Sequence, residues 1–256
     1  MTTIDNELQD GVRRLRLRSE GPNTLDAAVV ATLRSQLHRA AQAGEPVLLG
    51  SANRFVCNGL DLAWALSSSR AELRAFFLAM GNLVLELLEL PVPVACAMTG
   101  HAVGAGKSLV LACDVRVGST AKCLLGAPEV KLGVPNPAFA DRLLRAVASD
   151  RVANDLLYSG RLVTAEEAVS LGLLDGAVAP EAVEPQAVER LLALAAQPRH
   201  AWAATKRQRS LDLCAAIRGQ LESHIDGVVL EHWFGDEAQH LLHAAAAALA
   251  RPRPAR

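Results

Sequence analysis

The chain has 256 residues, of which 51% are apolar, and its 26 basic and 27 acidic side chains give a formal net charge of −1. This length is sufficient for a large hydrophobic core in one domain, or in a domain with an appended region. The balanced charge argues against a nucleic-acid-binding protein, which normally carries a basic face.

The first part of the chain alternates short apolar segments with segments of helical periodicity. Residues 12–17 mix apolar and basic side chains in near alternation, which predicts a half-buried strand. Residues 27–44 carry apolar side chains at helical spacing, with Asp26 as the expected N-cap and Gly44 as the expected C-cap. The apolar residues 47–50 then predict a short buried strand.

Two glycine-containing loops follow, and each leads towards a helical pattern. The first loop, residues 58–61, precedes a long helix predicted over about residues 71–90. Two prolines end this helix before an apolar strand at residues 94–98, and the second loop, residues 100–106, comes directly after that strand. Another strand is expected at residues 114–117.

Repeated strand–loop–helix units of this kind predict an α/β fold with largely parallel strands. Beyond Asp141 the pattern becomes mainly helical, and Thr164 is the expected N-cap of one of these helices. The sequence therefore predicts an α/β part followed by a helical part.

Several other classes of protein and site are not expected from the sequence. The N-terminal segment lacks the apolar centre of a signal peptide, and the longest apolar stretches are too short to span a bilayer. The seven histidines are scattered without metal-ligand spacing. The five cysteines form no C-x-x-C pair and lie mostly in apolar runs, so we expect buried, reduced thiols in a cytoplasmic protein.

The second glycine-rich loop is a candidate anion site, because backbone N–H groups at a tight turn or a helix N-terminus attract negative charge. Its end, Gly106-Lys107-Ser108, resembles the end of a Walker phosphate loop. The glycine that this motif requires earlier would stand at position 101, which is His101, and no G-x-G-x-x-G occurs. Taken alone, the loop identifies no ligand.

Several segments, taken in order, resemble the crotonase (enoyl-CoA hydratase/isomerase) family. Residues 56–62 (VCNGLDL) resemble the first family loop, F-x-A-G-x-D-L/I. Residues 91–114 (PVPVACAMTGHAVGAGKSLVLACD) resemble the second family loop. Residues 125–133 (LGAPEVKLG) resemble the segment that follows it, F-x-x-P-E-V/I-x-L-G. Residues 157–161, 165–168 and 171–173 resemble L-x-T-G-R, A-E-E-A and G-L-V. Order and spacing agree from about residue 10 to residue 180, so the chain is identified as a member of this family.

The resemblance implies an α/β crotonase (ClpP-like) fold. Residues 1–190 would form a spiral of ββα turns, and residues 191–256 would form a helical region that covers the pocket and assembles homotrimers or hexamers. The substrate would be an acyl thioester of coenzyme A or of an acyl-carrier protein. No separate cofactor, metal, nucleic acid or membrane span is implied.

By the same resemblance, the main-chain N–H groups of Leu60 and Ala105 form an oxyanion hole, with Gly59 and Gly104 beside them at the substrate. Two fixed donors aimed at a thioester oxygen favour the enolate, in which that oxygen gains charge. The loss of one such donor typically raises the barrier by about 3–4 kcal/mol.

The proton-transfer groups depart from the pattern of the family hydratases, which use two glutamates to hold a water molecule. Glu129 occupies one of these positions, but Ser108 occupies the other. A serine without a partner is neither a general acid nor a general base at pH 7. This favours an isomerase-like enzyme with Glu129 as the single acid/base over a two-glutamate hydratase.

Decarboxylation, thioester hydrolysis and carbon–carbon bond formation are also open to a single glutamate. One alternative is a biosynthetic crotonase that acts as a dehydratase, decarboxylase or cyclase on a carrier-bound polyketide or other thioester. A second alternative is a catalytically silent member that only binds acyl thioesters.

Other residues receive roles from their positions. Asp61 lies in the substrate loop and is expected to cap the next helix, while Ser108 and Asn136 are candidates to face the substrate. Lys107 could be a polar group near the pocket, but a lysine at this position more often faces solvent or a subunit surface, and we expect that position.

Two pairs of residues complete the predicted site. Trp233 and Phe234 are candidates for the pocket wall or a subunit interface, with core packing as an equal alternative. Arg54 and Lys206 are candidate cations for the phosphates of coenzyme A, although each is individually more typical of an ordinary surface charge.

Overall fold

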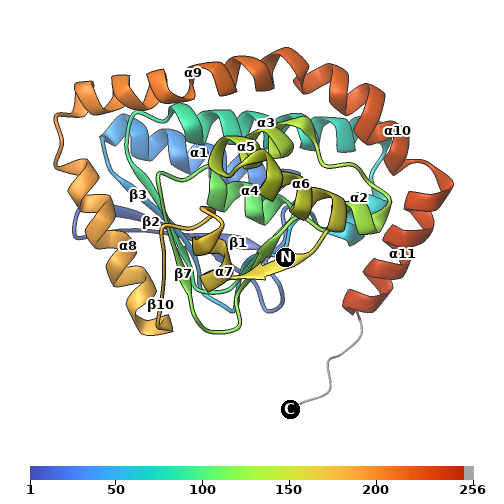
Figure 1. The fold of residues 1–256 in the computed structure, drawn as a ribbon, viewed down its shortest axis with the longest axis horizontal. Coiled ribbons are helices and arrows are strands. Elements are labelled where there is room, and N and C mark those ends of the chain that lie inside the picture. The colour runs from blue at the N-terminus through green and yellow to red at the C-terminus, as the bar shows by residue number, and fades with distance from the viewer. Residues whose placement is uncertain (251–256) are drawn as a thin grey trace.

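The computed structural model describes residues 1–250, which form two β-sheets enclosed by helices (Figure 1). The larger sheet has six strands in the order β1-β2-β3-β5-β7-β10. Their bounds are β1 (Thr3–Gln9), β2 (Val12–Arg18), β3 (Val47–Ser51), β5 (Val94–Met98), β7 (Val115–Ser119) and β10 (Gly176–Val178). β1 and β2 form an antiparallel hairpin, and all other neighbours in this sheet are parallel.

The smaller sheet has four strands in the order β4-β6-β8-β9. Their bounds are β4 (Phe55–Cys57), β6 (His101–Val103), β8 (Leu124–Gly126) and β9 (Leu162–Thr164). In each of the successive pairs β3/β4, β5/β6 and β7/β8, the first strand joins the larger sheet and the second joins the smaller one. Helical elements follow each pair, so the structure confirms the predicted spiral of ββα turns.

Eight helical elements lie within the spiral, and the capping residues predicted for α1 and α7 are confirmed. They are α1 (Ala27–Ala43), α2 (Leu62–Ser67), α3 (Arg70–Glu89), α4 (Ala105–Leu111), the short 3-10 helix η1 (Glu129–Leu132), α5 (Ala138–Val147), α6 (Asp150–Ser159) and α7 (Ala165–Ser170). The Asp26 carboxylate accepts a hydrogen bond from the Val29 N–H at 2.9 Å, and Gly44 ends α1 at a φ of 74°. Thr164 caps α7 as expected.

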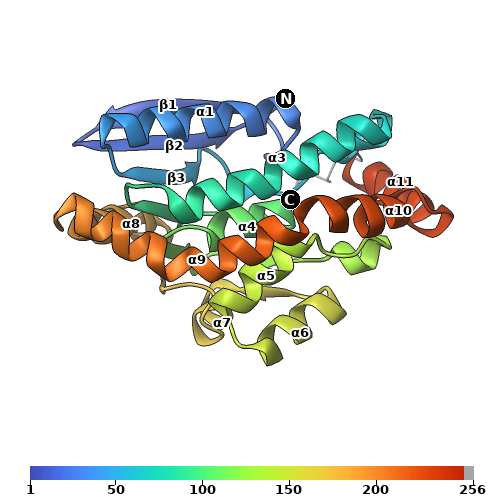
Figure 2. The ribbon, with the colours of Figure 1, turned by 90° about the horizontal axis from the view of Figure 1, so that it is seen from above.

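The C-terminal helices lie along one side and at both ends of the spiral (Figures 1 and 2). They are α8 (Pro180–Ala195), α9 (Arg199–His224), the π-helical turn η2 (Ile225–Val229), α10 (Leu230–Trp233) and α11 (Asp236–Ala250). Leu221, Trp233 and Leu242 from these helices belong to the same buried cluster as side chains of the spiral. Residues 251–256 of the predicted C-terminal region lie outside the described residues, and the division at residue 190 stays a prediction.

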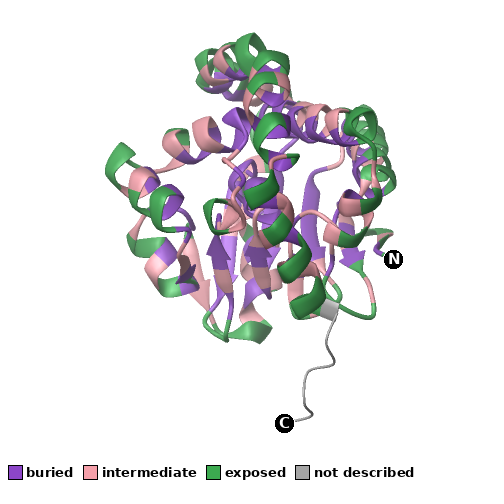
Figure 3. Ribbon diagram, turned by 90° about the vertical axis from the view of Figure 1, so that its right-hand side faces the viewer, coloured by how far each residue is buried: buried purple, intermediate pink, exposed green. Residues whose placement is uncertain are grey.

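Buried residues gather on the strands and on the inward faces of the helices (Figure 3). All five cysteines are buried and unpaired, as the sequence predicted. Among the described residues, no helix combines the length and apolar character that crossing a membrane requires.

Candidate active site

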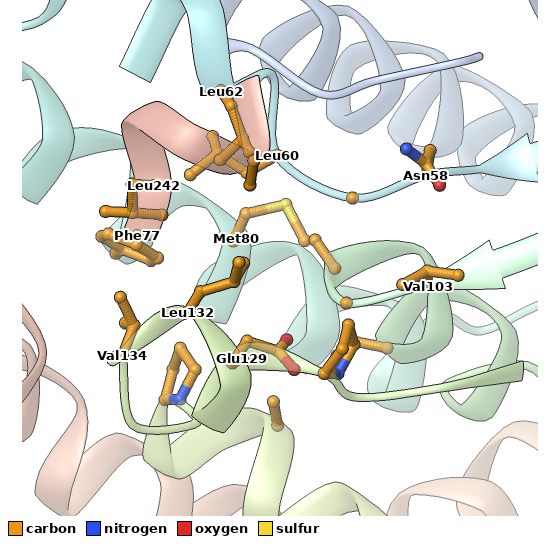
Figure 4. Close-up of a pocket in the computed structure, with 18 of the residues that line it drawn as sticks. Asn58, Leu60, Leu62, Phe77, Met80, Val103, Glu129, Leu132, Val134 and Leu242 are labelled. Carbon is orange, nitrogen blue, oxygen red and sulfur yellow. The ribbon is translucent and has the colours of Figure 1, made fainter. Parts of the chain in front are cut away.

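A cavity of about 380 Å³ lies where the loops after β4 and β6 meet η1, α3 and α11 (Figure 4). Its lining is mainly apolar. The polar side chains among the described lining residues are Asn58, Ser108 and Glu129, and Glu129 is the ionisable one. Gly59, Leu60, Gly104 and Ala105 also line this cavity.

The Leu60 main chain is oriented by a parallel bridge with Leu25. The Leu25 N–H donates to the Gly59 carbonyl at 2.8 Å, and the Leu25 carbonyl accepts from the Asp61 N–H at 2.9 Å. Leu60 lies between these two bonded residues, and in a parallel bridge such a middle residue directs its own N–H away from the partner strand, here away from Leu25. The Leu60 N–H has no acceptor within residues 1–250.

The Ala105 N–H is left free by the start of a helix. Ala105 is the first residue of α4, and the first N–H groups of a helix have no intrahelical acceptor. Gly104 turns the chain into this helix at φ 58° and ψ −121°, a backbone conformation that favours glycine. Within the part of the chain that the structure describes, the Ala105 N–H has no acceptor.

The two loops are in direct contact because β4 and β6 are parallel neighbours, so their carboxyl ends meet at one edge of the small sheet. Gly59 has a φ of 92°, and a methyl group added there would lie 3.1 Å from the Val103 carbonyl oxygen and 3.6 Å from the Ala105 nitrogen. The loops therefore bring two unused backbone donors to one side of the cavity.

The Glu129 carboxylate lies against this pair of loops. Glu129 is the first residue of η1, and a methyl group added at Gly104 would lie 3.3 Å from Glu129 Oε1. Asn136 Nδ2 donates to Glu129 Oε2 at 3.2 Å. Asn136 is thus a neighbour of Glu129 and is not itself part of the cavity lining. In Figure 4 the Glu129 carboxylate stands among apolar side chains, with Leu60 and Met80 on the other side of the cavity.

Two adjacent polar residues of α4 are fully enclosed. Ser108 has no exposed surface, and its hydroxyl lines the cavity without a hydrogen-bond partner among the described residues. Lys107 is only 2% exposed, and its Nζ likewise has no partner within the described chain. The expected solvent-facing position of Lys107 is wrong, because α4 is packed against α5 and β6 and residues 106–111 are all buried.

Part of the apolar wall comes from α3, which the sequence did not connect with the site, and part comes from the C-terminal helices, which the resemblance places over the pocket. Phe76, Phe77 and Met80 come from α3, and Leu242 comes from α11. Trp233 lines the cavity, 3% exposed, and packs edge-on against Phe77 with ring centroids 6.1 Å apart. The α3 residues have ordinary helical spacing, which in a sequence is indistinguishable from core packing. Trp233 was a candidate for the pocket wall, and the structure places it there.

Several predicted contacts lie elsewhere. Phe234 is 40% exposed and lies under the Arg70 guanidinium, outside the cavity lining. Asp61 also lies outside the lining and caps α2, with Oδ1 accepting from the Trp64 N–H at 3.0 Å.

The two candidate cations for the carrier phosphates are not at the cavity. Lys206 is buried and its Nζ lies 2.6 Å from Asp114 Oδ2, so its charge is already paired inside the protein. Arg54 packs on the ring of Phe55 at 5.2 Å, at the start of β4, whereas the cavity lies beyond the end of that strand. The structure thus does not support either residue as a phosphate contact at this site.

Comparisons with known proteins agree on one family. Residues 7–235 match the family model described as enoyl-CoA hydratase/isomerase. The chain is 32% identical over 172 residues to the peroxisomal enoyl-CoA delta isomerase 2 of Arabidopsis thaliana, covering 64% of this chain and 72% of that protein.

Solved structures show the same fold. The human mitochondrial delta3-delta2-enoyl-CoA isomerase matches with a TM-score of 0.90 at 22% identity, over 97% of each chain. An enoyl-CoA hydratase from Bacillus halodurans matches with a TM-score of 0.85 at 24% identity, over 94% of this chain and 99% of that one. At these identities the structural matches establish the fold.

Proposed function

Because the chain belongs to the enoyl-CoA hydratase/isomerase family and is thus an enzyme of the lyase or isomerase type, we propose that it shifts the double bond of an unsaturated acyl-CoA thioester, with Glu129 as its single acid/base. One observation carries this proposal. The ionisable side chain of the described cavity lining lies directly against two loops that present unused backbone donors.

The donors act on the thioester oxygen. The Leu60 and Ala105 N–H groups hydrogen-bond this oxygen and stabilise the negative charge that it gains when the thioester becomes an enolate. The donors are fixed by the Leu25 bridge and by the start of α4, so they need no reorganisation during the reaction. The apolar surroundings strengthen these hydrogen bonds because little water competes for the oxygen.

Glu129 then moves one proton between two carbons. Its carboxylate removes a proton from C2 of a 3-enoyl thioester, and the electron pair of that C–H bond delocalises into the thioester oxygen. The protonated Glu129 returns the same proton to C4, and the double bond comes to rest between C2 and C3. Asn136 keeps the carboxylate in place through its hydrogen bond to Oε2.

The position of Ser108 argues against efficient hydration. Adding water to a double bond requires a base for the water and an acid for the carbon, and two carboxylates share this work in the family's hydratases. The described lining of this cavity supplies one carboxylate, and a serine hydroxyl without a basic partner activates no water. Isomerisation needs a single proton carrier, which the site contains.

The test compares the wild-type enzyme with Glu129→Gln on two substrates, a 3-enoyl-CoA and crotonyl-CoA, and also offers the 3-enoyl chain on an acyl-carrier protein. We expect wild-type isomerisation of the CoA substrate to exceed hydration, and E129Q to lose about 10²–10⁴-fold in kcat, the usual contribution of a general acid/base. Glu237→Gln, on the exposed face of α11, is the matched control and keeps full activity.

A wild-type enzyme that processes neither CoA substrate contradicts the proposal. Preferred turnover of the carrier-protein substrate favours the biosynthetic alternative, and binding without turnover favours the silent one.

A further inference from the structure

Ser108 carries a buried hydroxyl group that the proposed reaction does not use. The residue has no exposed surface, it lines the cavity, and its Oγ has no hydrogen-bond partner within residues 1–250. A buried hydroxyl without a partner is costly, so such groups in folded proteins are normally paired with protein, water or a ligand. The cavity side of α4 therefore contains a polar group for which the described chain supplies no partner.

The unpaired state of this hydroxyl is unusual among the helices of the protein. Serine and threonine side chains inside a helix commonly donate to the carbonyl four residues earlier. Five other hydroxyls of the described helices do so at 2.6–3.2 Å, namely those of Thr32, Ser159, Ser170, Thr205 and Ser210. Gly104 occupies the corresponding position for Ser108, but the Ser108 hydroxyl does not donate to its carbonyl. The hydroxyl thus stays available where Ser108 borders the cavity.

Ser108 lies close to the groups that are proposed to hold the thioester. It follows Ala105 by three residues on α4, a spacing that places two residues on the same helix face with about 5–6 Å between their Cβ atoms. Both residues line the cavity, as does Glu129, whose Oε1 lies against Gly104 at the start of the helix. A substituent a few carbons along the acyl chain has a similar separation from the thioester oxygen, so it comes within reach of the Ser108 hydroxyl.

The other polar side chains of the described lining do not pair with this hydroxyl. Glu129 Oε2 accepts from Asn136 Nδ2, and Ser108 Oγ forms no hydrogen bond with the carboxylate. Asn58 belongs to the loop after β4, and Figure 4 shows its side chain well apart from the Glu129 carboxylate. The rest of the described lining is mainly apolar. An oxygen atom of a ligand in the cavity is therefore a suitable partner for Ser108.

We propose that Ser108 is a substrate-binding residue that donates a hydrogen bond to a hydroxyl or oxo oxygen on the acyl chain, so that the enzyme prefers oxygenated acyl-CoA thioesters to plain hydrocarbon chains. The inference rests on the proposed binding of an acyl-CoA thioester in this cavity and adds the class of acyl chain. In a 3-enoyl chain, C5 can carry such an oxygen, because C5 takes no part in the proton transfer between C2 and C4. The hydrogen bond forms in apolar surroundings, where it is stronger than in water.

The experiment uses isothermal titration calorimetry to measure the Kd of hexanoyl-CoA and of its 3-hydroxy and 5-hydroxy derivatives for the wild-type protein and for Ser108→Ala. We expect the wild type to bind at least one hydroxylated ligand about 3–10-fold more tightly than hexanoyl-CoA, the usual effect of one added hydrogen bond. S108A is expected to lose this preference while its Kd for hexanoyl-CoA stays the same. Ser210→Ala is the matched control and is expected to keep the preference, because Ser210 is a buried serine outside the cavity lining.

The stability of S108A gives a second readout. Because the hydroxyl has no partner in the described chain, its removal is expected to leave the midpoint of urea unfolding unchanged or higher. A clearly destabilised S108A would show that the protein itself uses the hydroxyl, which overturns the inference. Equal affinity of the wild type for all three ligands, or a preference that S108A retains, also overturns it.

The three ligands are saturated and undergo no isomerisation, so the measurement does not depend on proton transfer by Glu129. A wild-type protein that binds none of them overturns this inference together with the proposed function. Loss of the expected preference alone, with hexanoyl-CoA still bound, overturns only the role of Ser108.

Discussion

At the scale of single residues, the proposed oxyanion hole depends on main-chain atoms that side-chain identity does not reveal. Leu60 and Ala105 have apolar side chains, and nothing in their chemistry marks them as polar contacts. Their N–H groups are available as donors because of the local geometry. Leu60 is the middle residue of a parallel bridge, and Ala105 is the first residue of a helix. The resemblance in sequence located both positions, and the structure shows both N–H groups without acceptors in its described residues.

Ala105→Pro tests the donor directly. Proline is well tolerated at the first position of a helix and lacks an N–H, so it removes the donor while keeping α4. We expect kcat to fall by about 10²–10³-fold with little change in the circular dichroism spectrum. Ala105→Gly keeps the N–H and is expected to retain most activity. A proline variant with wild-type turnover would remove Ala105 from the oxyanion hole.

The burial of some polar side chains could not be predicted from residue type and sequence position alone. Ser108 and Lys107 are neighbours in the sequence, and only the packing of α4 against α5 determines that both are enclosed. Lysine usually faces solvent, which is why the sequence pointed to an exposed position. Burial of a polar group on α4 depends on its tertiary contacts with α5 and β6, which the local sequence pattern does not contain.

At the scale of elements, the long helices and several five-residue strands were predictable, whereas the three-residue strands were not. α1 and α3 were expected within a residue or two of their observed ends, because their apolar periodicity extends over several turns and their ends carry capping residues. The strands β4, β6, β8 and β9 have three residues each, too few for an alternation to be recognised. The polar β1 was missed because as an edge strand it buries little.

Asp61 illustrates a residue whose role belongs to its element. Its carboxylate caps α2 and also accepts from the Thr24 hydroxyl at 2.9 Å, so it fixes the loop that holds Leu60. Asp61→Ala is expected to lower the free energy of unfolding by about 1–2 kcal/mol, since it removes a cap and a hydrogen bond.

Asp61→Asn provides the comparison, because asparagine caps helices as well as aspartate does. We expect D61N to keep near-wild-type stability and kcat, measured by urea unfolding and by the isomerase assay. Loss of turnover in a fully folded D61N would show that the carboxylate takes part in the chemistry.

At the scale of the whole molecule, the C-terminal helices are joined to the spiral by a buried ion pair. Lys206 on α9 binds Asp114, and the same carboxylate accepts from the Val94 N–H at 2.9 Å at the start of β5. Lys206 thereby connects α9 with the larger sheet. Assembly into homotrimers or hexamers, which the sequence resemblance implies, stays a prediction.

Lys206→Met tests this connection. It leaves Asp114 buried without its cation, which is expected to lower the free energy of unfolding by about 3–5 kcal/mol in urea titrations. The double variant Lys206→Met with Asp114→Asn removes both charges and is expected to recover part of the loss. If K206M is as stable as the wild type, the pair contributes nothing to holding α9 on the sheet.

The location of the proposed donors on the main chain also bears on how such an enzyme evolves. A point mutation replaces a side chain but leaves the peptide N–H in place unless it introduces proline or disturbs the turn. Most amino-acid substitutions at Leu60 or Ala105 therefore leave the proposed N–H donors in place. A substitution at Glu129, in contrast, removes the proposed proton carrier. A substitution at Ser108 or Glu129 would therefore change the proton-transfer groups while leaving the proposed oxyanion hole in place.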